Sequence, residues 1–480
     1  MTKTMYKSIH FVGIGGIGMS ALAYVCLNQG YAVSGSTLSG EESLLDALEK
    51  KGALIYKSHH ASYISEEVEC VVISSSIKSD NVEWLEARKK NKIILHRSEL
   101  LDHLILDYQI IAISGTHGKT TTTALIGHML DVAGYDPLII TGGIMPLYHS
   151  NVRQGKGAWA VIEADESDGT FLNLSRVDIA VVTNVEPEHM EFYGTEEKLF
   201  SFFSKFLLKA SKKRIIGNMG SFCQDFTKYH DDSSLNVTYG SQGSVYCQNV
   251  CPFIEGTQFD AIFVNSAMTW DGLKLHLKGV HNVHNALAAI SVAQTLGIKA
   301  LDVYKAFSTF KSVQRRMTHT GSAQGVHVLD DYAHHPTEIK AVLEALRCHY
   351  PGKKIFIIFQ PHRYTRLQYL MEEFAESFCD ADEVMVLPVY GAGEKPLKDI
   401  NSSVLLEKIQ KFHKRAYIFS EWGVSLQDLC DHLARFLNQE DIIVCCGAGD
   451  ITNLAYALPK ALERTLVEID SLVNSSLAWK

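Results

Sequence analysis

The sequence predicts an α/β protein of three domains, and three observations support this fold class. The chain has 480 residues, enough for two to four domains that each bury their own core. Apolar, β-branched runs alternate with stretches of helical character. Two glycine-rich turns each join such a run to a helix, which is typical of parallel α/β units. We expect the domains to span residues 1–108, 109–320 and 321–480.

Composition and charge exclude several classes of protein. Hydrophobic residues make up 46% and charged residues 21%, as in ordinary soluble globular proteins. The net charge of −9 and the lack of a basic tract argue against a nucleic-acid binder. No apolar run approaches the roughly 20 residues that span a bilayer. The polar residues 1–8 lead directly into a strand, so they do not resemble a signal peptide.

The ten cysteines favour a reducing compartment. Most stand in apolar runs, as Cys26, Cys70 and Cys445 do, where a cysteine acts as a small core residue. No paired C-x-x-C spacing indicates zinc, and a chain of this length does not need disulfides. We expect a cytoplasmic protein with no nucleic-acid or membrane partner.

The first domain opens with a strand (9–12), the glycine turn 13–18 and a helix (19–28). The turn matches G-x-G-x-x-G, which holds a diphosphate at the start of a Rossmann-like unit. A dinucleotide site also needs an acidic residue at the end of the second strand (32–35), where Ser36 and Thr37 stand instead. A diphosphate other than NAD is therefore the better expectation.

Two later strands of this domain end in polar residues. The strand 70–73 runs into a loop with Ser75 and Ser76, at the sheet edge where ligands of α/β folds bind. Ordinary loop polarity is the alternative. A strand at 92–95 precedes Ser98, which we expect to cap the next helix. The domain should end near Asp107.

The second domain is organised around residues 115–120, Gly-Thr-His-Gly-Lys-Thr. They follow a buried strand (109–114) and precede a helix (124–130), which is the layout of a phosphate-binding P-loop. Lys119 would reach the terminal phosphates, and the Thr120 hydroxyl would ligate Mg²⁺. Only two residues separate the first glycine from Gly-Lys, where the usual pattern has four. A plain turn between strand and helix is the alternative.

An acidic stretch ends the next strand (158–162). Residues 163–168 contain four carboxylates, whose repulsion a divalent cation would relieve; a solvated acidic turn is the alternative. The strand 177–183 leads to Glu188 and His189. His189 is a candidate second metal ligand, although a lone histidine is as often structural.

The rest of this domain is less informative. We expect irregular short strands over 211–275 and draw no function from them. Residues 279–285 open a helix over 286–296. Asn282 could read the edge of a base or cap this helix. A boundary is expected near Gly321.

The third domain again alternates strands (326–329, 354–359, 383–387 and 442–446) with helices. Polar clusters end every strand, at 330–336, 360–366, 390–394 and 447–450, so one edge of the sheet should be functional. Arg363 and Arg366 lie three apart and would share a helix face that suits a carboxylate or a phosphate. Surface salt bridging is the alternative.

Together these stretches resemble the Mur ligases of peptidoglycan synthesis, in the same order and over nearly the full length. The matching stretches are HFVGIGGIGMSALA (10–23), SSSIKSDN (74–81), GTHGKTTTT (115–123), EADESD (163–168), TNVEPEHM (183–190), HNVHNALAA (281–289), DDYAHHPTEI (330–339), QPHRYTR (360–366) and GAGDIT (447–452).

The resemblance implies a Rossmann-like N-terminal domain for a UDP-sugar, a central P-loop ATPase domain with a mostly parallel sheet, and a Rossmann-like C-terminal domain for an amino acid. Within the family it points to the branch that joins L-alanine to UDP-N-acetylmuramate. ATP would phosphorylate the lactyl carboxylate, the alanine amine would attack the acyl phosphate, and the tetrahedral intermediate would collapse to amide, ADP and phosphate. The sequence does not identify the base that would deprotonate the alanine amine. The protein would act as a monomer or a homodimer.

The resemblance also implies site residues. Those for ATP are Gly115, Thr116, His117, Gly118, Lys119, Thr120, Thr121, Asn282 and Arg316. Those for the UDP-sugar are Gly15, Gly16, Ile17, Gly18, Ser75 and Ser76. Those for the amino acid are Tyr332, His334, Arg363 and Arg366. The metal ligands would be Thr120, Glu166 and His189, for two Mg²⁺ ions that Mn²⁺ could replace. Catalysis would depend on Lys119, His189, His334, Arg363 and Arg366.

Three departures from the family pattern stand out. Thr37 replaces a usual aspartate near the uridine, Glu188 and Glu191 replace aspartates beside His189, and either Glu163 or Glu166 could be the metal ligand. The nearest alternative is the related ligase that recycles a murein tripeptide, against which GIGGIG and DESD argue. More distant alternatives are an NAD-dependent oxidoreductase and a P-loop NTPase switch.

Overall fold

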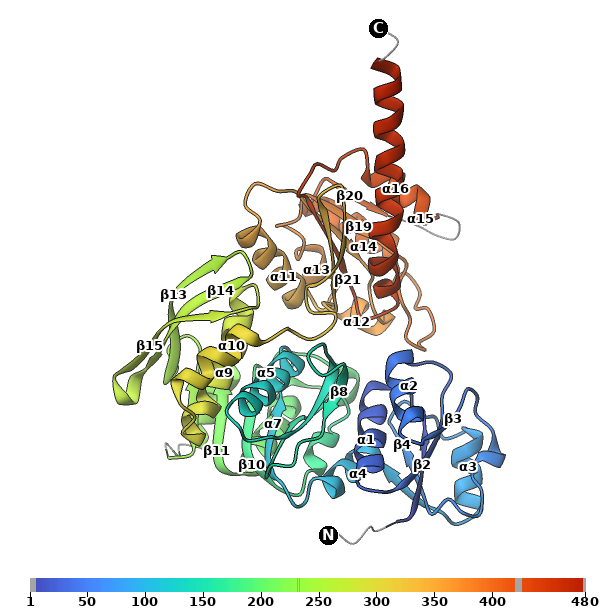
Figure 1. Cartoon of the computed structure of the whole chain (residues 1–480), viewed down its shortest axis with the longest axis vertical. Helices are drawn as coiled ribbons and strands as arrows, with labels where there is room; N and C mark the ends of the chain where they lie inside the picture. Colours follow the sequence, from blue (N-terminus) through green and yellow to red (C-terminus); the bar gives the residue numbers. More distant parts are fainter. Residues whose placement is uncertain (1–5, 231, 233, 419–424, 478–480) are drawn as a thin grey trace. The chain divides into compact units, whose positions relative to one another are not determined.

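The computed structural model describes residues 6–230, 232, 234–418 and 425–477 (Figure 1). Most of the polar stretch 1–8, which we do not expect to be a signal peptide, lies outside these residues. The chain forms two compact units. The first comprises Met1–Cys251, Gln258–His276 and Asn282–Val313; the second comprises Pro252–Thr257, Leu277–His281 and Gln314–Lys480.

The N-terminal part of the first unit is a five-stranded parallel sheet of order β3-β2-β1-β4-β5. Its elements are β1 (Ser8–Val12), α1 (Ile17–Asn28), β2 (Ala32–Ser36), α2 (Glu42–Lys50), β3 (Leu54–Tyr56), η1 (Ala61–Tyr63), β4 (Cys70–Ile73), α3 (Val82–Lys89), β5 (Ile93–His96) and α4 (Arg97–Leu104). The predicted strands are confirmed. β3 was missed because it has three residues, none of them buried, and so shows no apolar run.

Ser98 does not cap α4, so that prediction is wrong. The helix starts directly after β5, and its cap is His96, whose Nδ1 accepts the Ser98 N–H at 3.3 Å. The Glu99 carboxylate completes a capping box by accepting the His96 N–H at 2.7 Å.

The rest of the first unit is built on a ten-stranded sheet of order β15-β14-β13-β12-β11-β10-β6-β9-β7-β8. The strands around β6 run parallel to it. The elements are β6 (Gln109–Ser114), α5 (Lys119–Val132), β7 (Leu138–Met145), β8 (Ser150–Arg153), β9 (Trp159–Glu163), η2 (Thr170–Asn173), β10 (Val177–Val182), α6 (Met190–Tyr193), α7 (Glu196–Leu208), β11 (Ala210–Gly217), α8 (Ser221–Tyr229), β12 (Asn236–Tyr239), β13 (Val245–Phe253), β14 (Gly256–Phe263), η3 (Val264–Ser266), β15 (Met268–Leu275), α9 (Val280–Leu296) and α10 (Ala300–Thr309).

Two expectations for this part are corrected. The stretch 211–275 contains α8 and strands of up to nine residues, rather than only irregular short strands. Helix α9 begins at Val280, six residues before the predicted start, so Asn282 lies inside the helix and does not cap it. Asn282 and Asn285 are buried, and the packing of α9 outweighs their low helix propensity.

The second unit holds a six-stranded sheet of order β16-β17-β21-β18-β19-β20, parallel except for the antiparallel edge strand β16. Its elements are β16 (Thr318–Ala323), β17 (Val326–Asp331), α11 (Pro336–His349), β18 (Ile355–Phe359), α12 (Tyr364–Tyr369), α13 (Met371–Ala375), β19 (Glu383–Val386), α14 (Ser402–Phe412), β20 (Ala416–Ile418), α15 (Leu426–Leu433), β21 (Ile442–Cys446) and α16 (Ile451–Leu477). The four predicted strands are confirmed, whereas β16 and β20 were missed. Gly321, the expected boundary, lies inside β16.

Helices cover both faces of this sheet. Side chains of α11, α13 and α14 pack with Ile357 and Cys446 on one face, and side chains of α15 and α16 pack with Ile358 and Cys445 on the other. The adjacent cysteines of β21 therefore enter different cores, as small apolar residues. Among the described residues, no helix is both long and apolar enough to cross a membrane.

Candidate active site

The loop between β6 and α5 has the backbone that phosphate binding requires. Gly115 (φ +134°) and Gly118 (φ +80°) both adopt positive φ, which favours glycine. A Cβ on Gly115 would lie 2.9 Å from the Thr183 backbone nitrogen, and one on Gly118 would overlap the Asn285 amide. Helix α5 starts at Lys119, so its first free N–H groups face the loop.

The segment after β10 holds this loop in place. Asn184 accepts the His117 N–H at 2.9 Å and donates to the His117 carbonyl at 3.0 Å. The Thr183 hydroxyl donates to that carbonyl at 2.6 Å, and the Thr116 hydroxyl accepts the Glu186 N–H at 2.9 Å. Thr183 and Asn184 stand in a stretch that matches the family, but their support of the loop was not predicted from the sequence.

Lys119 lies in a pocket of carboxylates. Its Nζ donates to the Gly115 carbonyl at 2.6 Å, to the Thr116 carbonyl at 3.0 Å and to Glu166 Oε1 at 2.9 Å. Burial alone would lower the pKa of Lys119, but Glu166, Glu163 and Asp165 raise it above its ordinary value. The ammonium therefore stays charged, and its three N–H groups are directed at the loop carbonyls and Glu166.

The two candidate metal-binding glutamates occupy different surroundings. Glu163, at the end of β9, accepts from the Thr120 hydroxyl at 3.1 Å and from the Gly142 N–H at 2.6 Å. Glu166 is 2% exposed, and burial raises its pKa. Its Oε2 has no hydrogen-bond partner in the described part of the chain.

His189 approaches the same carboxylate. Its Nε2 lies 3.9 Å from Glu166 Oε1 and its Nδ1 lies 3.8 Å from Glu191 Oε1, and its backbone adopts φ +55°. The buried Tyr193 hydroxyl donates to the Glu166 carbonyl at 2.5 Å and so holds the acidic loop. The structure thus brings Lys119, Glu166 and His189 together and places Thr120 against Glu163.

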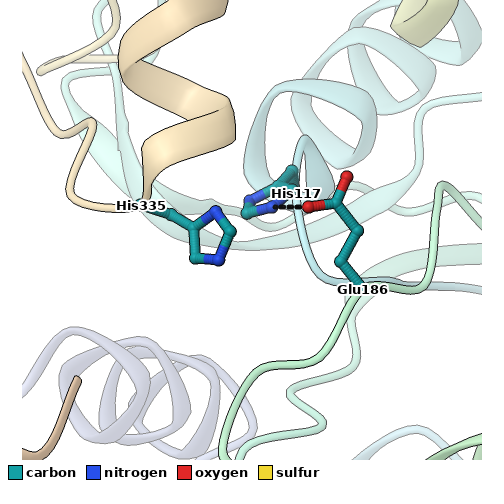
Figure 2. A group of neighbouring side chains, drawn as sticks. All are labelled: His117, Glu186 and His335. Carbon is teal, nitrogen blue, oxygen red and sulfur yellow. Dashed lines mark ion pairs between the residues drawn. The ribbon is translucent and has the colours of Figure 1, made fainter. Parts of the chain in front are cut away.

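His117 points from the phosphate loop toward Glu186. Figure 2 shows this pair, with His117 Nε2 3.4 Å from Glu186 Oε2. His335, which is also drawn there, belongs to the second unit, where it caps α11 by accepting the Thr337 N–H at 3.3 Å.

Two asparagines of α9 form a buried polar group beside the loop. Asn285 donates to Asn282 Oδ1 at 3.1 Å and accepts from the Thr122 hydroxyl at 3.2 Å. Asn282 was singled out from the sequence, whereas Asn285 was not, although it repeats the same residue type three positions on.

The N-terminal glycine turn is built by close backbone approach. A Cβ on Gly15 would overlap the Ser39 carbonyl, and Gly16 is the N-cap of α1. The buried Thr37 hydroxyl donates to Ser39, which keeps it within its own loop. Ser75 Oγ lies 3.1 Å from His96 Nε2 and donates to Asp168. Ser76 is exposed.

The second unit gathers its predicted residues at the carboxyl ends of β17 and β18. His334 Nδ1 lies 2.8 Å from the Tyr332 carbonyl, and its ring stands 5.9 Å from the His362 ring. Arg366 Nη1 lies 3.1 Å from His362 Nδ1, and Arg363 has φ +68° as the N-cap of α12.

The pKa of His362 reflects its burial and the charged groups around it. Burial lowers its pKa, and the nearby His334, Arg366, Arg363 and Arg315 lower it further, to about 3. A neutral imidazole among cationic side chains indicates a positive local potential, which suits a carboxylate. His362 was not predicted as a site residue from the sequence, although it stands beside Arg363 in a stretch that matches the family.

Two neighbouring arginines stack on one tyrosine of the same unit. The guanidinium carbons of Arg315 and Arg316 lie 4.8 and 5.4 Å from the Tyr332 ring centroid. Arg315 also donates to the Gly447 carbonyl at 2.6 Å. Arg316, expected to bind ATP, is thus beside the predicted amino-acid residue Tyr332.

Three family models match the chain in order. They are the Mur ligase family, catalytic domain (residues 8–109), the Mur ligase middle domain (113–293) and the Mur ligase, glutamate ligase domain (315–449). The chain belongs to the Mur ligase family. Membership confirms the expected fold class of three α/β domains, with a central P-loop domain between two Rossmann-like ones.

Individual family members match over nearly the whole chain. The UDP-N-acetylmuramate–L-alanine ligase of Brucella ovis is 41% identical over 467 residues, which cover 95% of this chain and 97% of that protein. That of Brucella anthropi is 42% identical over 465 residues, with 95% and 97% coverage. The solved UDP-N-acetylmuramate-alanine ligase of Thermotoga maritima superposes with a TM-score of 0.81 at 28% identity, covering 95% of this chain and 99% of that one. A murein peptide ligase from Psychrobacter arcticus, at TM-score 0.68, 21% identity and coverage of 95% and 99%, shares the fold.

Proposed function

We propose that this Mur ligase joins L-alanine to the lactyl carboxylate of UDP-N-acetylmuramate at the expense of ATP, in the synthesis of peptidoglycan precursors. The observation that carries the proposal is the phosphate loop, whose Lys119 is set among the carboxylates of the acidic loop. The relatives named for this reaction, at about two-fifths identity over nearly the full length, support the choice of substrates.

The first step is transfer of the γ-phosphoryl group of ATP to the lactyl carboxylate, giving an acyl phosphate and ADP. Both reactants are anionic, so the site must neutralise charge and hold them in line. The charged Lys119 and the N–H groups at the start of α5 supply positive partners for the phosphates. The proposed ATP site is Gly115, Thr116, His117, Gly118, Lys119, Thr120, Thr121, Asn282 and Arg316.

The carboxylates of the central domain fit a divalent cation. The unpartnered, buried Oε2 of Glu166 and the neighbouring His189 are the strongest indication, because a buried carboxylate oxygen without a donor is costly unless a cation binds it. We propose Thr120, Glu166 and His189 as ligands of Mg²⁺, for two ions in all, with Mn²⁺ as a substitute. When bound, Mg²⁺ would neutralise charge on the phosphates and on the carboxylate.

The second step is attack of the alanine amine on the acyl phosphate, which forms a C–N bond and releases phosphate from the tetrahedral intermediate. The cationic cluster of the second unit supports binding of the alanine carboxylate by Arg363 and Arg366, with Tyr332 and His334 beside them. His334 Nδ1 lies 3.3 Å from Glu338, which orients its ring.

The UDP-sugar is proposed to bind at Gly15, Gly16, Ile17, Gly18, Ser75 and Ser76, with its diphosphate at the start of α1. The proposal also includes the domain boundaries 1–108, 109–320 and 321–480 and a cytoplasmic location. The protein would act as a monomer or a homodimer without nucleic-acid or membrane partners. All ten cysteines are free, as in a reducing compartment.

The test is phosphate release from ATP and Mg²⁺ with UDP-N-acetylmuramate present and amino acids added one at a time. We expect release only with both UDP-N-acetylmuramate and L-alanine, and a loss of at least about 100-fold in Lys119→Ala. A murein tripeptide in place of L-alanine tests the recycling ligase. Release without the UDP-sugar, or indifference to every amino acid, would leave only a P-loop ATPase and overturn the proposal.

A further inference from the structure

A charged cluster connects the N-terminal sheet domain to the acidic loop of the central domain, within the first unit. Arg97, the first residue of α4, donates through Nη2 to Asp165 Oδ2 at 2.7 Å, and the same nitrogen lies 3.9 Å from Asp168 Oδ2. Ser75 donates to Asp168 as well. The proposed reaction assigns no role to Arg97, Asp165 or Asp168.

Hydrogen bonds further along α4 keep this arrangement in register. Asn173 of η2 donates to Ser98 Oγ at 2.8 Å, and the Ser175 N–H donates to Asp102 Oδ1 at 2.8 Å. The chain that follows the acidic residues is therefore attached to α4 at further points beyond the Arg97 ion pair. Because the acidic loop is held to α4 at these further points, Arg97 loses less conformational freedom when it binds Asp165.

Arg97 also faces the glycine turn. A Cβ on Gly18 would come 3.4 Å from Arg97 Nη1, so one edge of the guanidinium lies against the first turn of α1 while the other edge binds Asp165. Helix N-termini favour anions, and a guanidinium beside one adds donors arranged in a planar fork. The side chain remains 25% exposed and can be reached by a ligand.

On the other side, Asp165 adjoins the phosphate loop. It is followed directly by Glu166, which accepts from Lys119 at 2.9 Å. Arg97 in turn donates to Asp165 Oδ2 at 2.7 Å. Arg97 and Lys119 therefore act on one acidic loop from its two sides.

We propose that Arg97 is a positioning residue that couples the UDP-sugar site to the phosphoryl-transfer centre through Asp165. The proposal rests on the proposed function, because it takes the diphosphate to bind at the turn that contains Gly18. With that anion bound, Arg97 lies between the diphosphate and Asp165 and sets the position of the sugar nucleotide relative to Glu166 and Lys119. Its contribution is orientation of the lactyl carboxylate rather than contact with the reacting atoms.

The test is a double-mutant cycle on the full chain, with kcat and the KM for UDP-N-acetylmuramate measured by phosphate release. We expect Arg97→Ala to raise that KM and to lower kcat, each by about 10-fold, and Asp165→Asn to lower kcat by a similar factor. The double variant should fall within about twofold of Arg97→Ala alone, because each change already breaks the same link. Arg97→Lys should recover the KM but not kcat, since an ammonium cannot bind two anions through a planar fork.

Arg88→Ala is the matched control. Arg88 lies on α3 of the same sheet domain, exposed, with its guanidinium 5.2 Å from the Trp84 ring centroid, so its loss removes the same charge outside the cluster. Its kinetic constants should stay within about twofold of wild type.

Two results would overturn the coupling while leaving the proposed function intact. One is an active wild type in which the effects of Arg97→Ala and Asp165→Asn multiply. The other is an Arg97→Ala protein with a lowered melting temperature but unchanged kcat and KM, which would make Arg97 a packing residue. A wild type without release that depends on UDP-sugar and alanine would instead overturn the proposed function, and the coupling with it.

Discussion

Gly118 closes the phosphate loop, and replacing it with alanine tests how the loop depends on its neighbours. Two costs add in Gly118→Ala. The left-handed backbone (φ +80°) costs an L-residue about 1–2 kcal/mol. The new Cβ would overlap Asn285 Oδ1 and lie 3.3 Å from Asn285 Cγ, so this buried side chain must move.

The cost of moving Asn285 follows from its hydrogen bonds. It accepts from Thr122 at 3.2 Å and donates to Asn282 at 3.1 Å, and each such bond contributes about 0.5–1.5 kcal/mol net. We therefore expect Gly118→Ala to lower the free energy of unfolding of the central domain by about 2–5 kcal/mol. The KM for ATP should also rise, because the loop N–H groups shift with Gly118.

Gly134→Ala provides the matched control at the other end of α5. Gly134 has φ +82°, nearly the same backbone, and a Cβ there would meet no atom within 4 Å. It should cost only the backbone term, about 1–2 kcal/mol, and leave the KM for ATP unchanged. The difference between the two variants isolates the collision with Asn285.

Thermal unfolding and ATP kinetics measure both effects. For a domain of this size a destabilisation of 1 kcal/mol lowers the melting temperature by about 2–4 °C. If both alanine variants melted at the same temperature and bound ATP equally well, the collision would have no energetic consequence. That result would refute the conclusion that the buried Asn285 side chain must move to admit a Cβ at position 118.

Three further predictions concern the carboxylates and the cationic cluster around His362. Glu166→Gln should raise the Mg²⁺ concentration needed for half-maximal activity more than Glu163→Gln does, because Glu166 Oε2 is unpartnered among the described residues whereas Glu163 already accepts two hydrogen bonds; the reverse order would exchange the two roles. Arg366→Ala should raise the KM for L-alanine about 10- to 100-fold. An NMR titration should also show the pKa of His362 rising from about 3 in that variant, and an unchanged pKa would contradict the electrostatic account. Burial raises the pKa of Asp331 from 3.8 to about 6, so the folded chain keeps a proton that the unfolded chain releases. Stability of the second unit should therefore fall by about 3 kcal/mol in all as pH rises from about 3, below the unfolded pKa, to about 7, above the folded pKa; urea midpoints measured against pH should lose this slope in Asp331→Asn, and a slope that persists would assign it to another group.

Elements with strong local signals were predicted well. β6, β9, β10 and β18 are apolar, β-branched runs, and any context that buries them makes them strands. Elements with weak local signals were missed or misplaced. β3 has only three residues, none of them buried. α9 begins at Val280 because the packing of its buried residues stabilises the helix over histidines and asparagines that have low helix propensity.

The cap of α4 shows a similar limit. Both His96 and Ser98 could cap a helix, and the sequence favours serine. The choice depends on where β5 ends, which its pairing with β4 decides, since Ile73 pairs with His96. A prediction from neighbouring residues alone places the cap two residues too late, because the contact that decides its position is distant in the chain.

The sequence by itself determined the three-part α/β organisation, the phosphate loop, the acidic stretch and the paired arginines, because glycine spacing, apolar periodicity and clustered charge act over a few neighbouring residues. Only the tertiary structure decided which partners these groups have. It set Glu166 against Lys119 and His189, and Glu163 against Thr120, although the two glutamates are three residues apart. It also brought Arg97 to Asp165 and surrounded His362 with cations. Ion pairs and pKa values depend on distance and burial in space, and residues 68 apart in the chain meet only after the sheets have formed.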